Sequence, residues 1–215
     1  MSDSSTPRGD GPAVPAASDI RQAMLSQRKD LSAATVEQHS GAVARHLVAL
    51  AAVTGARTVG AYAALGGEVD PAPALALLAA VPYLPVIGPD SSMEFRLSSP
   101  EYPSIANRYG IAEPPASAPS IEPAELDVVL VPLVAFDATG ARIGMGAGYY
   151  DRHFAFRQRA GGPPLLVGVA HGFQEVPSIE RHPWDVALDL VVTEAGQRVE
   201  KSVADTPFSP GDGQQ

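Results

Sequence analysis

The feature that most constrains the fold is the near-continuous apolar segment DVVLVPLVA at residues 127–135. Strands that alternate apolar and polar residues bury one face, whereas an uninterrupted apolar run is typical of a strand buried on both faces. Such strands belong to parallel sheets with helices on both sides. The segment therefore predicts an α/β fold.

The rest of the chain alternates helical and extended patterns, as that fold requires. Ile20, Met24 and Leu31 recur at helical spacing, and Ser18 or Asp19 is the expected cap of that helix. The other expected helices are 35–52, 71–80 and 149–159, and the expected strands are 58–65, 83–87, 94–97, 165–170 and 188–193. Residues 100–123 read as a long connection rich in proline. We expect one domain over 19–200, with a mostly parallel sheet covered on both faces. Disordered tails are expected at 1–18 and 201–215, which are rich in Ser, Pro, Gly and Asp.

Composition excludes several classes of protein. A formal net charge of −9 argues against nucleic acid as the main partner, and the absence of cysteine excludes disulfides and thiolate chemistry. No apolar run approaches the length of a membrane span, and residues 1–17 lack the layout of a signal peptide, so the expected location is cytoplasmic. The five histidines show no zinc-site spacing, and no transition-metal site is expected.

The sequence RIGMGAGYYD at residues 142–151 is the strongest candidate for a functional loop. Its glycines permit positive φ, which lets backbone N–H groups approach an anion. Arg142 is a natural phosphate partner, and the carboxylate of Asp151 is a ligand type that suits Mg²⁺. The loop matches neither the dinucleotide fingerprint nor the Walker A motif. It is interpreted as a nucleotide-phosphate site, with a glycine-rich turn that serves packing alone as the alternative.

Other charged residues allow two interpretations each. Glu68 follows a glycine pair at the end of an expected strand, where it either binds a ligand or is a solvated turn carboxylate or a cap for the next helix. Sequence alone favours the turn or cap interpretation over ligand binding. Asp185 is either a second magnesium-side carboxylate or a turn residue. Arg21 and Arg28 lie seven positions apart, on one helical face, and either reach phosphate or extend over the core.

Several blocks, in order and at compatible spacing, together resemble the 5-formyltetrahydrofolate cyclo-ligase family, also called methenyltetrahydrofolate synthetases. The resemblance covers roughly residues 20–194. Its blocks are VPLVAFD at 131–137, RIGMGAGYYDR at 142–152, GEVD at 67–70, LPV at 84–86, NRYGI at 107–111 with EP at 113–114, QEV at 174–176 and PWD at 183–185. The resemblance implies a three-layer α/β/α domain.

The resemblance also implies an activity, which is the conversion of 5-formyltetrahydrofolate to 5,10-methenyltetrahydrofolate with ATP as co-substrate and Mg²⁺ as cofactor. The implied partners are thus a reduced folate and ATP. No nucleic acid or membrane is expected as a partner, and no protein partner can be inferred. The implied catalytic residues are Arg142, Tyr149 and Asp151, and the magnesium-side carboxylates are Asp151 and Asp185. ATP would be bound by Arg21, Arg142, Ile143, Gly144, Met145, Gly146, Ala147, Gly148, Tyr149 and Tyr150. The folate would be bound by Ala63, Glu68, Met145, Gly146, Ala147, Gly148 and Tyr149.

The chain departs from the family pattern at two positions. Ala17 stands where many members carry a lysine, and Ala147 replaces a glycine or lysine within the loop. Two other functions therefore stay open at this point. One is a catalytically weak paralogue that binds folate or nucleotide, and the other is a different phosphate-binding α/β enzyme, such as a sugar-phosphate isomerase.

Overall fold

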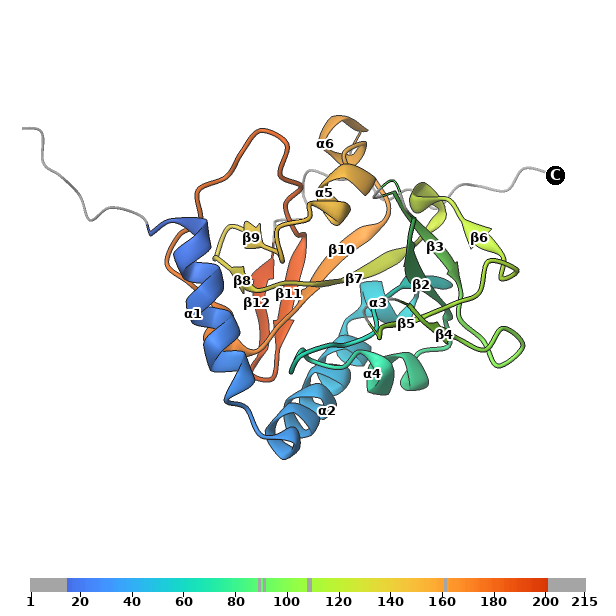
Figure 1. The fold of residues 1–215 in the computed structure, drawn as a ribbon, viewed down its shortest axis with the longest axis horizontal. Coiled ribbons are helices and arrows are strands. Elements are labelled where there is room, and N and C mark those ends of the chain that lie inside the picture. Colours follow the sequence, from blue (N-terminus) through green and yellow to red (C-terminus); the bar gives the residue numbers. More distant parts are fainter. Residues whose placement is uncertain (1–14, 89, 91, 108–109, 161, 201–215) are drawn as a thin grey trace, which may run out of the picture.

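A computed structural model describes residues 15–88, 90, 92–107, 110–160 and 162–200 (Figure 1). The strands of the main sheet are β1 (Thr58–Gly60), β2 (Val81–Ile87), β3 (Met93–Leu97), β6 (Ser120–Ile121), β7 (Val128–Pro132), β10 (Leu165–Val169), β11 (Leu190–Thr193) and β12 (Gly196–Glu200). Their order in this eight-stranded sheet is β12-β11-β10-β7-β1-β2-β3-β6. The central strands from β11 to β2 are parallel, whereas β12, β3 and β6 join antiparallel. The expected single-domain α/β fold with a mostly parallel sheet is confirmed.

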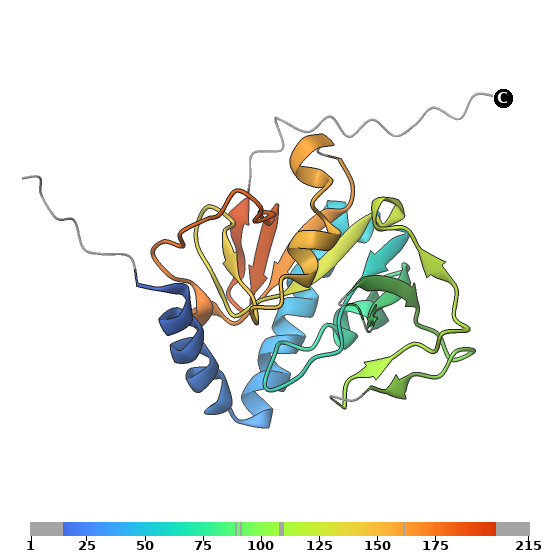
Figure 2. The same ribbon diagram turned by 45° about the horizontal axis from the view of Figure 1, so that its top comes forward.

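Helices cover both faces of this sheet. They are α1 (Ala17–Lys29), α2 (Ala33–Ala49), α3 (Ala51–Thr54), α4 (Ala72–Leu77), α5 (Tyr149–His153) and α6 (Arg157–Ala160). Figure 1 shows α2 and α4 on one side of the sheet and α5 and α6 on the other. α1 packs against a small hairpin of β8 (Ala135–Phe136) and β9 (Arg142–Ile143), at one end of the domain in both ribbon views (Figures 1 and 2).

The apolar segment at 127–135 supplies the centre of two hydrophobic cores. In β7, Val128 and Leu130 contribute to the core under α2 and α4, whereas Val129 and Val131 contribute to the core on the other face. Successive side chains of a strand point to opposite faces, so an uninterrupted apolar run fills both cores at once. This arrangement fixes β7 in the middle of the domain, and the glycine loop follows shortly after it.

The helix expected at 149–159 is wrong in one respect, because it is broken into α5 and α6. Phe154 is fully buried in the core below, and Phe156 packs against the same core. Side chains two positions apart face different directions on a regular helix, so both rings reach one core only if the helix stops between them. The break follows from that packing requirement.

Three other local expectations need correction. α1 begins at Ala17, and its cap position is Ala16 with no side-chain bond, so neither Ser18 nor Asp19 caps it. The strand expected at 58–65 ends at Gly60. The proline-rich connection at 100–123 contains β4 (Ile105–Ala106), β5 (Ala112–Glu113) and part of the main sheet in β6. Two-residue strands carry too little periodicity to be recognised in a sequence.

Two expectations concern the chain ends and membrane-spanning segments. The tails predicted at 1–18 and 201–215 lie outside the described residues, apart from 15–18, of which Ala17 and Ser18 already belong to α1. Within the described ranges, no helix combines the length and apolar character needed to cross a membrane.

Candidate functional site

The glycine loop, residues 144–148, joins β9 to α5 and has the backbone that its glycines predict. Gly146 has a φ of +99°, and Gly148 has a φ of +64° and directly precedes α5. Both angles lie in the region that favours glycine. In the part of the chain that the structure describes, no backbone N–H of residues 145–148 donates a hydrogen bond. The loop therefore presents unpaired donors of the kind that bind anions.

Two arginines hold this loop from outside. The Nε of Arg21, on α1, donates to the carbonyl of Gly144 at 2.9 Å, and Nη1 of Arg152 donates to the carbonyl of Ala147 at 2.7 Å. The guanidinium of Arg152 also lies over the ring of Tyr149, 5.4 Å from its centroid. Since both arginines bind carbonyl groups, the loop N–H groups stay available. The structure thus brings Arg21 to the loop across more than a hundred residues of sequence.

Arg142 and Asp151 form an ion pair that closes the loop at its base. Nη2 of Arg142 is 2.7 Å from Oδ1 of Asp151, and Nη1 of Arg142 donates to the carbonyl of Val186. The N–H of Val186 donates back to Oδ1 of Asp151 at 3.0 Å. The Arg142 side chain is only 7% exposed, so its position is fixed by these bonds. Arg142 therefore orients Asp151 and ties the loop to the segment that carries Asp185.

The two predicted magnesium-side carboxylates are consequently neighbours. Asp185 directly precedes Val186, and one of its oxygens, Oδ2, accepts from the N–H of His182 at 2.7 Å. Among the described residues, the bonds of Asp151 all use Oδ1, which leaves Oδ2 available for a ligand. A cleft of about 790 Å³ opens beside Asp185, and Asp151 is not among its lining residues, which are Arg157, Gln158, Arg181, His182, Pro183, Asp185, Val186, Ala187 and Asp189. Carboxylate oxygens beside an open cleft fit the requirements of Mg²⁺.

Glu68 is a largely buried, paired carboxylate and does not cap a helix. Its Oε1 is 3.5 Å from Nη1 of Arg28, and its Oε2 accepts from the N–H of Leu65 at 3.0 Å. The cap position of α4 is Pro71, and the carboxylate that accepts a bond at the start of this helix is Asp70, from the N–H of Ala72 at 2.9 Å. Burial raises the pKa of Glu68 above its usual value, and the nearby Arg28 guanidinium opposes this rise. The cap interpretation is therefore wrong, and Arg28 is a partner that sequence reasoning did not assign.

Tyr150 follows the glycine loop on α5, and its hydroxyl lies within electrostatic range of Glu68 and Arg142. Its hydroxyl is buried and has no hydrogen-bond partner among the residues described. Burial raises the pKa of Tyr150, the charge of Glu68 raises it further, and Arg142 lowers it. A buried hydroxyl without a partner is costly, so such a group in a natural protein indicates a place where a ligand or water binds.

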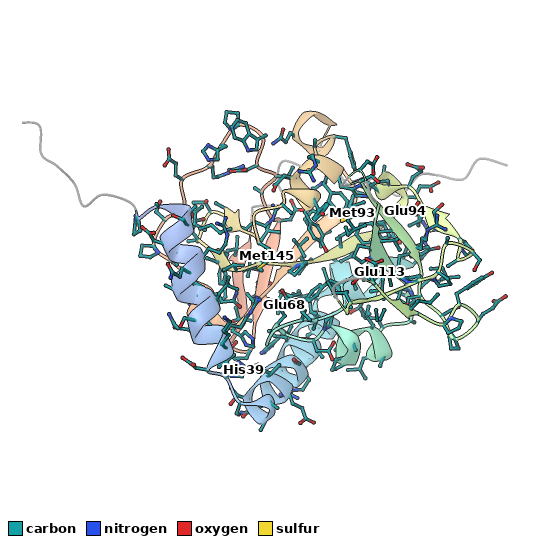
Figure 3. The ribbon with its side chains drawn as sticks, in the orientation of Figure 1. His39, Glu68, Met93, Glu94, Glu113 and Met145 are labelled. Atoms are coloured by element: carbon teal, nitrogen blue, oxygen red, sulfur yellow. The ribbon has the colours of Figure 1, made fainter. Side chains whose placement is uncertain are left out.

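The remaining predicted residues occupy the rim of this region. Met145 is 63% exposed at the tip of the loop, and Figure 3 shows it with Glu68 toward the end of the molecule that carries α1. Ala63 is half-buried. It was expected to lie within a strand, but β1 ends before it, at Gly60. Tyr149 faces a second cleft of about 320 Å³, which is lined by Asp90, Ser92, Met93, Tyr149, Arg152 and His153.

Comparisons with known proteins identify the family. Residues 13–194 match the profile of the 5-formyltetrahydrofolate cyclo-ligase family. The 5-formyltetrahydrofolate cyclo-ligase of Escherichia coli K12 is 34% identical over 177 residues, which is 79% of this chain and 96% of that protein. The protein of the same name from Haemophilus influenzae is 33% identical over 183 residues, 80% of this chain and 95% of its own.

A solved structure agrees with these sequence matches. The 5,10-methenyltetrahydrofolate synthetase of Aquifex aeolicus superposes with a TM-score of 0.73 at 31% identity, covering 85% of this chain and 91% of that one. The matches cover the glycine loop, Glu68 and Asp185, and nearly the whole length of the relatives. This chain belongs to the 5-formyltetrahydrofolate cyclo-ligase family of enzymes.

Proposed function

We propose that this protein converts 5-formyltetrahydrofolate to 5,10-methenyltetrahydrofolate, with ATP consumed and ADP and phosphate released. The observation that carries the proposal is a set of three groups: the loop N–H groups, which find no acceptor among the described residues, the largely buried carboxylate of Glu68, and the buried hydroxyl of Tyr150, which has no described partner and whose pKa the charge of Glu68 raises. This arrangement suits two ligands, an anion at the loop and a donor-rich ring at Glu68. The names of the relatives supply the substrate.

The reaction requires activation of a poor electrophile. The formyl group is an amide, and ring closure by the N10 amine would otherwise expel hydroxide. Transfer of the γ-phosphoryl group of ATP to the formyl oxygen makes that oxygen a leaving group. N10 then attacks the formyl carbon, the C–O bond breaks, phosphate departs, and the N10 proton is released. The contribution of the protein is therefore mainly to position the two substrates and to neutralise charge.

The residues of the loop have defined roles in this scheme. The N–H groups of residues 145–148 bind phosphate oxygens, and Arg21 holds the loop open by its bond to the carbonyl of Gly144. Glu68 accepts hydrogen bonds from N–H groups of the reduced folate. Burial raises the pKa of Glu68, and the Arg28 guanidinium opposes that rise and so favours the ionised form, which is the form that accepts such bonds.

A magnesium ion would be held by Asp151 and Asp185. A bound ion at this place supplies charge neutralisation for the phosphate oxygens. Arg142 fixes the direction of the Asp151 carboxylate, and the peptide between Asp185 and Val186 fixes the spacing of the two acids. The protein thus prepares both carboxylates before any ligand arrives, which lowers the cost of ordering them during the reaction.

A turnover assay tests the proposal. Purified protein with 5-formyltetrahydrofolate, ATP and Mg²⁺ is expected to give a rising near-ultraviolet absorbance from methenyltetrahydrofolate, and no rise when ATP is omitted. A folded sample that binds the folate but shows no ATP-dependent rise would identify a binding paralogue and overturn the proposal. Turnover that needs no ATP would point to a different phosphate-binding enzyme.

A further inference from the structure

Three potential metal ligands meet on the side of the domain near α2, away from Asp151 and Asp185. They are His39 on α2, His171 in the loop after β10, and Glu194 in the turn after β11. Their donor atoms all lie within 4.8 Å of one another. Figure 3 labels His39, below Glu68 in that view. Sequence spacing gave no sign of this cluster, because its members come from three separate segments.

The distances within the cluster suit a single small cation. Nδ1 of His39 is 2.9 Å from Nδ1 of His171 and 3.7 Å from Oε2 of Glu194. Ligands of a tetrahedral zinc ion, with bonds of about 2.0–2.1 Å, lie about 3.3 Å apart. These two separations bracket that value, and all three donors lie within 4.8 Å of one another, so adjustments of side-chain torsions bring them onto one ion.

Hydrogen bonds around the cluster fix which atoms carry lone pairs. Nε2 of His171 is 2.9 Å from the carbonyl of Gly67, so this nitrogen must carry the hydrogen. A neutral His171 then offers a lone pair at Nδ1, toward His39. In the metal-free protein the hydrogen between the two rings belongs to His39. When the hydrogen of His39 moves from Nδ1 to Nε2 of the same ring, both rings stay neutral and each offers an Nδ1 lone pair to a cation.

The candidate ligands are oriented by hydrogen bonds of the kind that orient metal ligands in known sites. Metal-binding histidines commonly donate their other N–H to a backbone carbonyl, as His171 does to Gly67. Glu194 is held by the N–H of Gly172 at 2.9 Å, and a Cβ at Gly172 would lie only 2.8 Å from a Glu194 oxygen. His39 and Glu194 are 21% and 25% exposed, which leaves a path from solvent. The nearby Arg28 does not repel a cation strongly, because it is paired with Glu68.

We propose that His39, His171 and Glu194 form a binding site for a divalent transition-metal ion of the zinc type, distinct from the pair Asp151 and Asp185. Two imidazoles and one carboxylate are a donor set that suits zinc and disfavours magnesium. The ion joins α2 and the ends of β10 and β11. Through the bond from His171 to Gly67 it also steadies the turn that carries Glu68. The proposal does not depend on the reaction that the enzyme catalyses.

Metal titration of the full-length protein tests this site. After removal of metals with a chelator, and without ATP or folate, calorimetry is expected to show one Zn²⁺ per chain with a dissociation constant on the order of 1 µM or tighter. Co²⁺ is expected to give visible absorption bands of a low-coordinate nitrogen site, which six-coordinate oxygen sites show only weakly. His39→Gln and Glu194→Gln are each expected to weaken Zn²⁺ binding about a hundredfold and to remove the Co²⁺ bands.

Two variants serve as matched controls. His46→Gln changes the same residue type on the same helix. Among the described residues, the His46 ring makes its hydrogen bond to the backbone carbonyl of Glu194, at 3.3 Å, and contributes no donor to the cluster. Asp151→Asn alters the other candidate site. Both are expected to keep the Zn²⁺ affinity and the Co²⁺ bands of the wild type. Glu194→Gln keeps an acceptor for the N–H of Gly172, so this variant tests Zn²⁺ binding by the cluster if His39→Gln does not fold.

Two results of these measurements would overturn the proposal. Absence of Zn²⁺ binding by the wild type at about 100 µM would mean that the cluster is only a hydrogen-bonded histidine pair. Equal Zn²⁺ binding by the wild type, His39→Gln and Glu194→Gln, together with its loss in Asp151→Asn, would assign the ion to the other carboxylates.

Discussion

The turn at Gly66–Gly67 and the loop at 144–148 share one structural arrangement, and they differ in the groups that surround them. In each, glycines take positive φ and an arginine of α1 donates its Nε to a glycine carbonyl. Arg28 binds the carbonyl of Gly66 at 3.1 Å, and Arg21 binds that of Gly144 at 2.9 Å. The two arginines are seven residues apart, which is about 10 Å along a helix. α1 therefore sets the distance between the two turns.

The surroundings make the first turn closed and the second open. A Cβ at Gly67 would lie 2.9 Å from the backbone carbonyl oxygen of Arg28, and the carbonyl of Gly67 is bound by His171. At Gly144, by contrast, an added Cβ would meet no described atom within 4 Å. The comparison teaches that glycine serves packing in one turn and access in the other. The closed turn fixes Glu68, and the open loop keeps its N–H groups for a ligand.

The largest expected effect comes from the carboxylate at the end of the open loop. We predict that Asp151→Asn lowers kcat on the order of a hundredfold, because the metal-directed charge is lost at the phosphoryl-transfer step. Asn retains an oxygen that can accept from Val186 N–H, so the fold is expected to persist. Steady-state kinetics over a magnesium titration, with circular dichroism as the control, measure this. Wild-type turnover at every magnesium concentration would remove Asp151 from the site.

A stability measurement sharpens the description of the closed turn. Gly67→Ala is expected to lower the free energy of unfolding by about 2 kcal/mol or more, because its φ is +79° and the new methyl group meets backbone. Gly66→Ala is the matched control. Its φ is +58° and its nearest neighbour, an Arg28 side-chain atom, is 4.0 Å away, so a loss of about 1 kcal/mol is expected. Equal losses in urea denaturation would show that close packing does not distinguish the two positions.

The contrast between the turns also explains what the sequence could predict. The glycine loop and Asp151 lie within one stretch of ten residues, so a shared role for them could be predicted from the sequence as a motif. The apolar run at 127–135 likewise predicted a strand buried on both faces, and β7 has that position. Both features depend on residues that are close together in the chain, so they can be recognised in the sequence.

Other contacts join segments that only the fold brings together. The pairing of Arg28 with Glu68 crosses from α1 to the turn after β1, and neither residue carries a mark of its partner. The His39 and His171 rings meet across 132 positions. The predicted extent of the helix at 149–159 was wrong for a related reason. The break after α5 is imposed by core packing of Phe154 and Phe156 and not by a helix-breaking residue. Long-range packing decides these features.

A smaller effect is expected within the open loop. We predict that Gly148→Ala lowers the free energy of unfolding by about 1 kcal/mol, because its φ is +64°. The methyl group would also lie 3.0 Å from Nη1 of Arg152, the atom that binds the carbonyl of Ala147. The loop N–H groups then lose their alignment, so the KM for ATP is expected to rise several-fold. Unchanged ATP kinetics would contradict the role of this backbone in phosphate binding.

The smallest expected effect on stability is at Gly144, and it completes the comparison. Gly144 does not have positive φ, and an added methyl group meets no described atom, so Gly144→Ala is expected to change the free energy of unfolding by less than about 0.5 kcal/mol. If the space beside the loop is where phosphate binds, the methyl group intrudes only when ATP is present. The KM for ATP should then rise while the melting temperature stays the same. That separation is not expected of Gly67→Ala, whose cost falls on folding itself. A Gly144→Ala variant that melts as early as Gly148→Ala would mean that the loop is strained throughout and is not held open for a ligand.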